Sequence, residues 1–85
     1  MVVGVQIADT MPPHAVIDYY TWGWDPAWDV VWMVVPTTPD SGSPQVEWTV
    51  GVERASGTQV TYHVTITNLT GNNLGVEGRY AIMNL

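Results

Sequence analysis

The stretch QVEWTVGVERASGTQVTYHVTIT, residues 45–67, decides the fold. Apolar side chains alternate with polar or small ones from Val46 to Glu53 and again from Val60 to Thr67. A period of two is typical of half-buried β-strands, and β-branched residues favour the same conformation. Ala55-Ser56-Gly57 lies between the two runs and supplies a short turn with a glycine. The stretch therefore predicts two antiparallel strands joined by a tight connection.

The alternation resumes after a polar loop. Residues 68–73, NLTGNN, have the composition of a loop, and residues 74–83 alternate again. Three successive strands with short connections predict a C-terminal three-strand meander. Asn68-Leu69-Thr70 also matches the acceptor pattern for N-glycosylation, although Asn68 serves equally well as a turn residue.

The N-terminal half is less regular but contains no clear helix. Residues 3–7 and 14–22 favour strands, and the prolines at 12 and 13 separate them. Residues 25–35 allow two interpretations. Asp25-Pro26 could begin a helix, but four valines between 29 and 35 favour a turn at 25–28 followed by a strand. We therefore expect one all-β domain over residues 1–85, a small antiparallel sandwich or barrel of six or seven strands.

The segment from 29 to 35 is apolar on both of its predicted faces. A strand covered on one side only should alternate, so the second apolar face needs a partner. A domain of 85 residues has few ways to cover both faces internally. We therefore expect a homo-oligomer, with the interface formed by Val30, Val31, Trp32, Met33 and Val34.

Four of the five tryptophans fall within residues 22–32, WGWDPAWDVVW. Large indoles can fill a small core, or they can stack against the faces of sugar rings. Trp32 and Trp48 lie within strand patterns and are expected in the core. Trp22, Trp24 and Trp28 surround a bend and are expected to be exposed contacts. The candidate ligand-binding residues are Trp22, Trp24, Asp25, Trp28, Asp29, Asn72 and Asn73.

Composition excludes several classes of function. Eight acidic residues face two arginines and no lysine, and the net charge of −6 opposes binding to nucleic acid or to anionic membranes.

The longest apolar run, residues 30–35, is too short to span a bilayer, and residues 1–9 lack the features of a signal peptide. We expect a soluble chain. Its low content of charged residues is common in extracellular and self-assembling β proteins, which is compatible with an extracellular or cell-surface location, and the absence of Cys leaves the compartment open.

Catalysis and metal binding have little support. His14 and His63 are isolated from each other in the sequence, and a zinc site needs about four ligands. His63 is expected on a strand surface near Thr or Glu neighbours. Asp40-Ser41-Gly42 is the only catalytic-looking tripeptide, but its flanking prolines place it in a loop. We expect neither an enzyme nor a cofactor.

Residues 62–83, YHVTITNLTGNNLGVEGRYAIM, resemble the strand–loop–strand of bacterial immunoglobulin-like modules. The resemblance covers about a quarter of the chain and implies a β-sandwich that works in adhesion, assembly or carbohydrate binding. The expected function is therefore a non-catalytic, self-associating interaction module. The alternative is a lectin-like carbohydrate-binding module that uses the tryptophan cluster.

Overall fold

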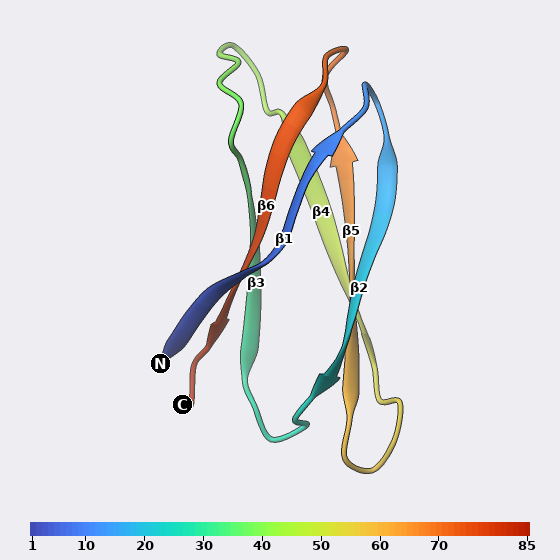
Figure 1. The fold of residues 1–85 in the computed structure, drawn as a ribbon, viewed down its shortest axis with the longest axis vertical. Helices are drawn as coiled ribbons and strands as arrows, with labels where there is room; N and C mark the ends of the chain where they lie inside the picture. The colour runs from blue at the N-terminus through green and yellow to red at the C-terminus, as the bar shows by residue number, and fades with distance from the viewer.

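The computed structural model describes residues 1–85 and contains six strands and no helix, which confirms the all-β prediction. The strands are β1 (Val2–Met11), β2 (Val16–Trp24), β3 (Val30–Pro36), β4 (Val46–Glu53), β5 (Val60–Asn68) and β6 (Leu74–Ile82). They run along the longest dimension of a molecule that measures 42 × 24 × 17 Å (Figure 1). The two termini lie close together at one end.

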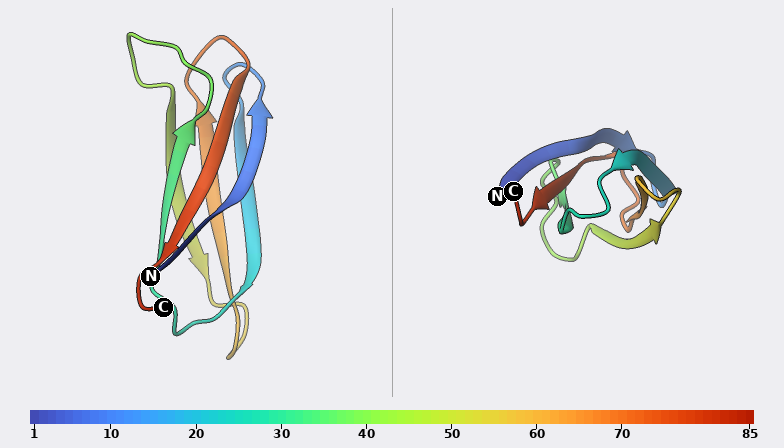
Figure 2. Two further views of the ribbon diagram at one scale, coloured as in Figure 1. Left: turned by 60° about the vertical axis from the view of Figure 1, so that its left-hand side comes forward. Right: turned by 90° about the horizontal axis from the view of Figure 1, so that it is seen from below.

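The strands form two antiparallel sheets of three strands each, in the orders β1-β6-β3 and β2-β5-β4 (Figure 2). The central strands β5 and β6 bury alternate residues, as their sequence period predicts. Twelve buried apolar side chains, contributed by both sheets, form one core. Every strand except β4 contributes to it.

The predicted C-terminal meander is wrong. β4 and β5 do form a hairpin, but β6 pairs with β1 and β3 in the other sheet. The apolar faces of β5 and β6 therefore lie in different sheets and pack into one shared core. A period of two shows that a strand has one apolar face, but it does not show whether the next strand pairs beside it or faces it.

The strand interpretation of residues 25–35 is confirmed. Asp25 forms a turn in which its carboxylate accepts a hydrogen bond from Ala27 N (2.9 Å) and its carbonyl accepts one from Trp28 N (3.1 Å). β3 then begins at Val30. Its inward side chains, Trp32 and Val34, are buried, and its outward ones, Val31 and Met33, are exposed. The predicted pair of apolar faces is present, with one face in the core and the other open.

Two of the predictions for the tryptophans are wrong. Trp24, expected to be exposed, is only 7% exposed and lies at the centre of a ring cluster. Its ring meets those of Trp32 and Tyr80 edge to face, at centroid distances of 5.4 and 5.1 Å. Trp48, expected in the core, is 37% exposed, because β4 lies at the edge of its sheet. Trp22 is exposed and Trp32 is buried, as predicted.

The position of Trp24 follows from an irregularity in β2. Tyr20 and Trp22 point outward, and regular alternation would send Trp24 the same way. The register with β5 shifts between Thr21 and Trp24, and Gly23 adopts a positive φ of 82°. The extra residue of this bulge turns Trp24 inward to pair with Val60.

Candidate functional site

A group of exposed apolar side chains lies on the outer side of the β1-β6-β3 sheet. Val31 pairs with Ala81, which pairs in turn with Val3, and Met33 and Val5 flank Arg79 in the next outward row. Val3, Val5, Val31 and Met33 are each more than half exposed. We call Val3, Val5, Val31, Met33 and Ala81 the apolar face. These residues line a hollow of about 360 Å³.

The apolar face carries one charged side chain in its lining, and that charge is neutralised. Arg79 is the only charged residue that lines the hollow. Its guanidinium donates a hydrogen bond to Glu77 Oε1 at 2.9 Å, from two residues along the same strand. On a chain of net charge −6, this is a region where another acidic molecule meets little repulsion.

The structure divides the predicted interface residues between two environments. Val31 and Met33 belong to the apolar face, whereas Trp32 and Val34 point into the core. Val30 is half-buried and packs against the core. Val3, Val5 and Ala81 were not predicted as part of this surface. The alternation of apolar and polar residues predicted strands at these positions. Only the pairing of β1 and β3 with β6 shows that Val3, Val5 and Ala81 share one face with Val31 and Met33.

The predicted ligand residues do not come together in one place. Trp22, Asp25 and Asp29 are exposed, Trp28 is half-buried against the core, and Trp24 is inside it. Asn72 and Asn73 lie in the β5–β6 loop, at the opposite end of the molecule from the β2–β3 turn (Figure 1). Trp22 is the only one of the predicted tryptophans that is available as an open platform.

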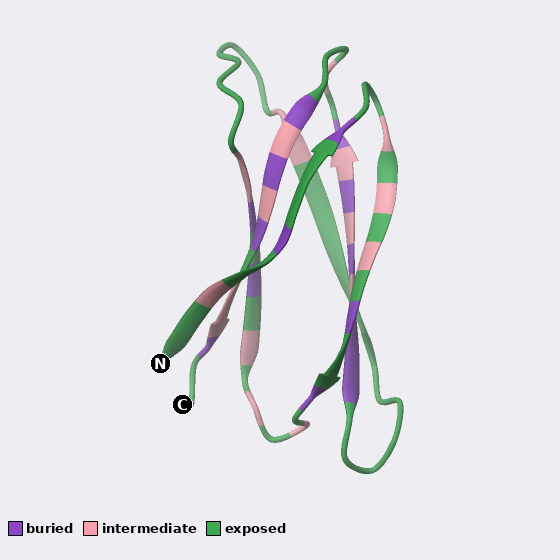
Figure 3. Ribbon diagram, in the orientation of Figure 1, coloured by how far each residue is buried: buried purple, intermediate pink, exposed green.

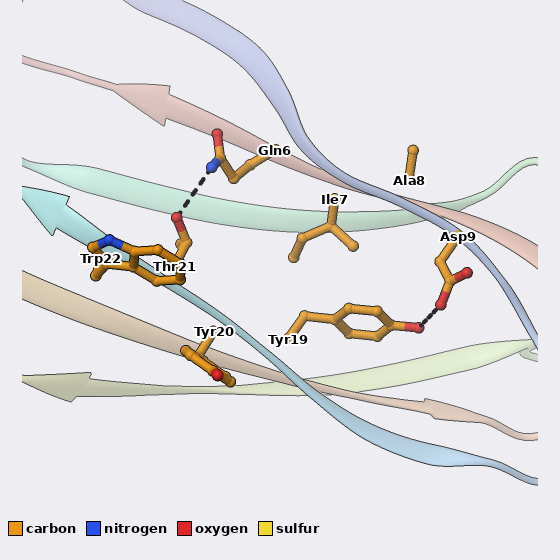
Figure 4. A pocket seen from close by; sticks show the side chains of 8 residues that line it. All are labelled: Gln6, Ile7, Ala8, Asp9, Tyr19, Tyr20, Thr21 and Trp22. Carbon is orange, nitrogen blue, oxygen red and sulfur yellow. Dashed lines mark hydrogen bonds between the residues drawn. The ribbon is translucent and has the colours of Figure 1, made fainter.

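A second hollow, of about 430 Å³, lies between β1 and β2 (Figure 4). Tyr19 donates a hydrogen bond to Asp9 Oδ2 at 2.6 Å, and Gln6 donates one to Thr21 Oγ1 at 3.0 Å. Burial raises the pKa of Tyr19, and the hydrogen bond to Asp9 raises it further because the tyrosinate would face a carboxylate. Trp22 lies at one end of this hollow beside Tyr20, with a ring-centroid distance of 6.0 Å. The sequence did not predict Gln6, Asp9 or Tyr19 as site residues, because β1 and β2 belong to different sheets and only tertiary packing brings them together.

His63 connects three strands on the outer side of the β2-β5-β4 sheet. Its Nδ1 lies 3.0 Å from Asp18 Oδ2, and its Nε2 lies 2.9 Å from Glu53 Oε1. The hydrogen bond to Asp18, followed by the one to Glu53, raises the pKa of His63. The ring also stacks on Tyr20, at a centroid distance of 6.0 Å. The prediction of a strand-surface histidine near Thr or Glu neighbours is confirmed by the contact with Glu53.

Comparison of the chain with protein-family models, with curated proteins and with solved structures finds no match. No group of three or more His, Cys, Asp or Glu side chains is arranged to hold a metal ion. The structure has no helix with the length and apolar character needed to cross a membrane.

Proposed function

We propose that this chain is a small β-sandwich that works as a self-associating interaction module, with the apolar face as its contact surface. The observation that supports this proposal is the continuous exposure of Val3, Val5, Val31 and Met33 on a sheet whose other side already covers the core. Contiguous exposed apolar patches mark interaction sites in soluble proteins.

The charge distribution favours a second copy of the chain as the partner. The Glu77–Arg79 ion pair can complement itself. When two copies of the chain are related by a two-fold axis, the arginine of each copy can approach the glutamate of the other. The same residues then serve on both sides of an isologous interface. Elsewhere the chain is acidic, so two copies meet the least repulsion when they approach through this face.

The expected strength is moderate. Covering a half-exposed Val or Met gives about 1 kcal/mol, so two copies together gain about 8 kcal/mol from these four side chains. Association costs about 4 to 15 kcal/mol in lost translational and rotational freedom and in ordering. We therefore expect a reversible equilibrium that depends on concentration.

The test is the molar mass in solution, measured by light scattering. Met33→Asp and Val31→Asp each place a carboxylate in the contact and should lower the mass below that of the wild type at the same protein concentration. Val16→Asp is the matched control, because Val16 is equally exposed but lies on the outer side of the other sheet. It should leave the mass of the wild type unchanged. Near-ultraviolet circular dichroism of the tryptophan cluster checks that each variant remains folded.

A lectin-like function is the second candidate, and the exposure of Trp22 beside the β1–β2 hollow favours it. Trp22 is 70% exposed and Tyr20 is 61% exposed, so both rings can stack on a pyranose. Gln6 and Asp9 line the same hollow and offer groups for sugar hydroxyls. This candidate predicts that a glycan quenches tryptophan fluorescence and that Trp22→Ala removes the effect without unfolding the protein. Absence of any response across a broad panel of glycans contradicts it.

A further inference from the structure

β4 is an edge strand that lacks the usual protections against pairing with another strand. Edge strands are commonly blunted by bulges, prolines, lysines or short length. β1 and β2 each contain a register irregularity, and β3 ends at Pro36. β4 runs over eight residues in unbroken register with β5 and contains no proline, and its two charged residues, Glu47 and Glu53, lie on its outer side. It is exposed along almost its whole length (Figure 3).

The exposed side chains of β4 include those on its core-facing side. Trp48, Val50 and Val52 pair with Ile66, Val64 and Tyr62, which are all buried. Directly opposed residues of an antiparallel pair share one face of the sheet, so the three β4 side chains point toward the interior. They are nevertheless 37%, 39% and 66% exposed. A strand added beside β4 would place its own side chains next to this uncovered apolar row.

The backbone of β4 is oriented for such an addition. The carbonyl of Gln45 accepts a hydrogen bond from Leu69 N, so Gln45 points its backbone groups toward the β5 side. In an antiparallel ladder every second residue does the same, which assigns positions 47, 49, 51 and 53 to the bonds with β5. The backbone N–H and C=O groups of Val46, Trp48, Val50 and Val52 therefore point to the open edge.

We propose that β4 pairs edge to edge and antiparallel with β4 of a second copy, with Thr49 on the two-fold axis. In this register Trp48 lies opposite Val50, and Val46 lies opposite Val52. All four of these positions carry backbone groups that point to the open edge, so they form the hydrogen-bonded pairs of the new ladder. The inward apolar rows of the two copies then continue into each other.

Charge favours this register over the neighbouring one centred on Val50, which overlaps the two strands equally well. With Thr49 at the centre, Glu47 lies opposite Gly51, and Glu53 lies opposite Gln45. A shift of the centre to Val50 would place Glu47 directly opposite Glu53, and like charges opposed across a ladder are destabilising. Two identical acidic chains therefore fit together at the Thr49 register without a carboxylate opposed to a carboxylate.

The β4 edge and the apolar face are separate surfaces, because they belong to different sheets. Each is self-complementary, so a chain that uses both can bind two copies and extend beyond a dimer. The β4 pairing does not depend on the proposed apolar contact. If the apolar face binds nothing, β4 pairing alone gives a dimer.

The absence of cysteine allows a direct test by cross-linking. A thiol introduced by Thr49→Cys lies on the two-fold axis, where opposed Cα atoms are about 4.5 Å apart and a disulfide is allowed. Gly51→Cys is the matched control on the same outward side of β4. In the proposed register, Gly51 of one copy is four residues from Gly51 of the other, about 13 Å. Both variants are made in the Met33→Asp background, so that failure of the apolar contact does not affect the result.

Mild oxidation should cross-link the Thr49→Cys chain into a dimer at least tenfold faster than the Gly51→Cys chain. Adding Val50→Lys to Thr49→Cys, which places a charge in the inward row of the edge, should abolish this difference. Val16→Lys, on the outer face of β2 at the opposite edge of the same sheet, should leave it intact. Equal rates for the two thiols would indicate random collision and would overturn the proposal. Faster cross-linking through Gly51→Cys would overturn the proposed register.

Discussion

At the scale of single residues, Asn68 is the best-connected polar side chain. It is fully buried, and its Nδ2 donates hydrogen bonds to the carbonyls of Pro12 and Asn72, both at 2.9 Å. Its Oδ1 accepts hydrogen bonds from Thr70 N at 2.9 Å and from Thr70 Oγ1 at 2.8 Å. One side chain thus holds the β1–β2 connection against the β5–β6 loop.

We predict that Asn68→Ala lowers the free energy of unfolding by about 2 to 4 kcal/mol, because buried carbonyls lose their donors. The measurement is equilibrium unfolding in urea. Asn72→Ala is the control from the same loop, because the Asn72 side chain is exposed, and it should change the stability by less than about 0.5 kcal/mol. Similar losses from both variants would contradict this role for Asn68.

The sequence identified Asn68 as a turn residue but could not show its burial. The match to a glycosylation acceptor suggests an accessible side chain, and in the folded chain this side chain is covered completely. Which carbonyls an asparagine reaches depends on the packing of two loops that are more than fifty residues apart in sequence. No local pattern records that contact.

His63 gives the stability a pH dependence with a defined sign. Its pKa in the folded protein is raised above the ordinary value of 6.5, because Asp18 and Glu53 accept hydrogen bonds from the protonated ring. The folded state therefore binds the proton more tightly than the unfolded chain does. The stabilisation is complete below about pH 6.5 and is lost as the pH rises through the folded pKa.

We predict that the wild type melts at a higher temperature than His63→Gln near pH 6, and that this difference disappears by about pH 9. Thermal unfolding at a series of pH values measures it. The Asp18→Asn/Glu53→Gln double variant should show little dependence on His63 at any pH. A difference that stays constant from pH 6 to pH 9 would contradict the coupling.

At the scale of elements, the bulge in β2 decides which tryptophan enters the core. Alternation alone places Trp22 and Trp24 on the same face, and the sequence prediction grouped them together. The inserted residue at Gly23 separates them, and the Trp24 indole N–H then donates a hydrogen bond to Thr21 Oγ1 at 3.1 Å. A glycine between two tryptophans is a signal for a bulge, but its effect depends on the register with β5.

We predict that Gly23→Ala destabilises the fold by about 1 to 2 kcal/mol through backbone strain alone. A Cβ at this position would meet no atom within 4 Å, so crowding does not contribute. Gly57→Ala is the matched control, because that position is equally open and does not have a positive φ. Thermal or urea unfolding of the two variants compares them directly. Equal stability of the two variants would show that the strained conformation is not required.

The element boundaries were more predictable than the pairing. Period-two alternation located the strands from 46 to 53, 60 to 68 and 74 to 82 almost residue by residue. It also indicated that the segment from 29 to 35 is apolar on both sides, which is the origin of the apolar face. It could not assign β6 to the opposite sheet, because that choice depends on which apolar faces pack together. The resemblance to immunoglobulin-like modules stays a prediction.

At the scale of the whole molecule, surface charge and apolar surface oppose each other. A net charge of −6 on 85 residues makes copies repel, whereas the contacts proposed at the apolar face and at the β4 edge would draw them together. Salt screens the repulsion and leaves apolar burial in place. Association through these surfaces should therefore become stronger as the ionic strength rises, opposite to the behaviour of a contact made by attraction between unlike charges.

Sedimentation equilibrium of the wild-type chain, over a range of protein concentrations and of salt, tests self-association most directly. Between about 0.01 M and about 1 M salt the screening length falls from about 30 Å to about 3 Å. We predict a weight-average mass well above the 9.4 kDa of a single chain, which increases with both protein concentration and salt. A mass of 9.4 kDa at every concentration and every ionic strength would contradict the account.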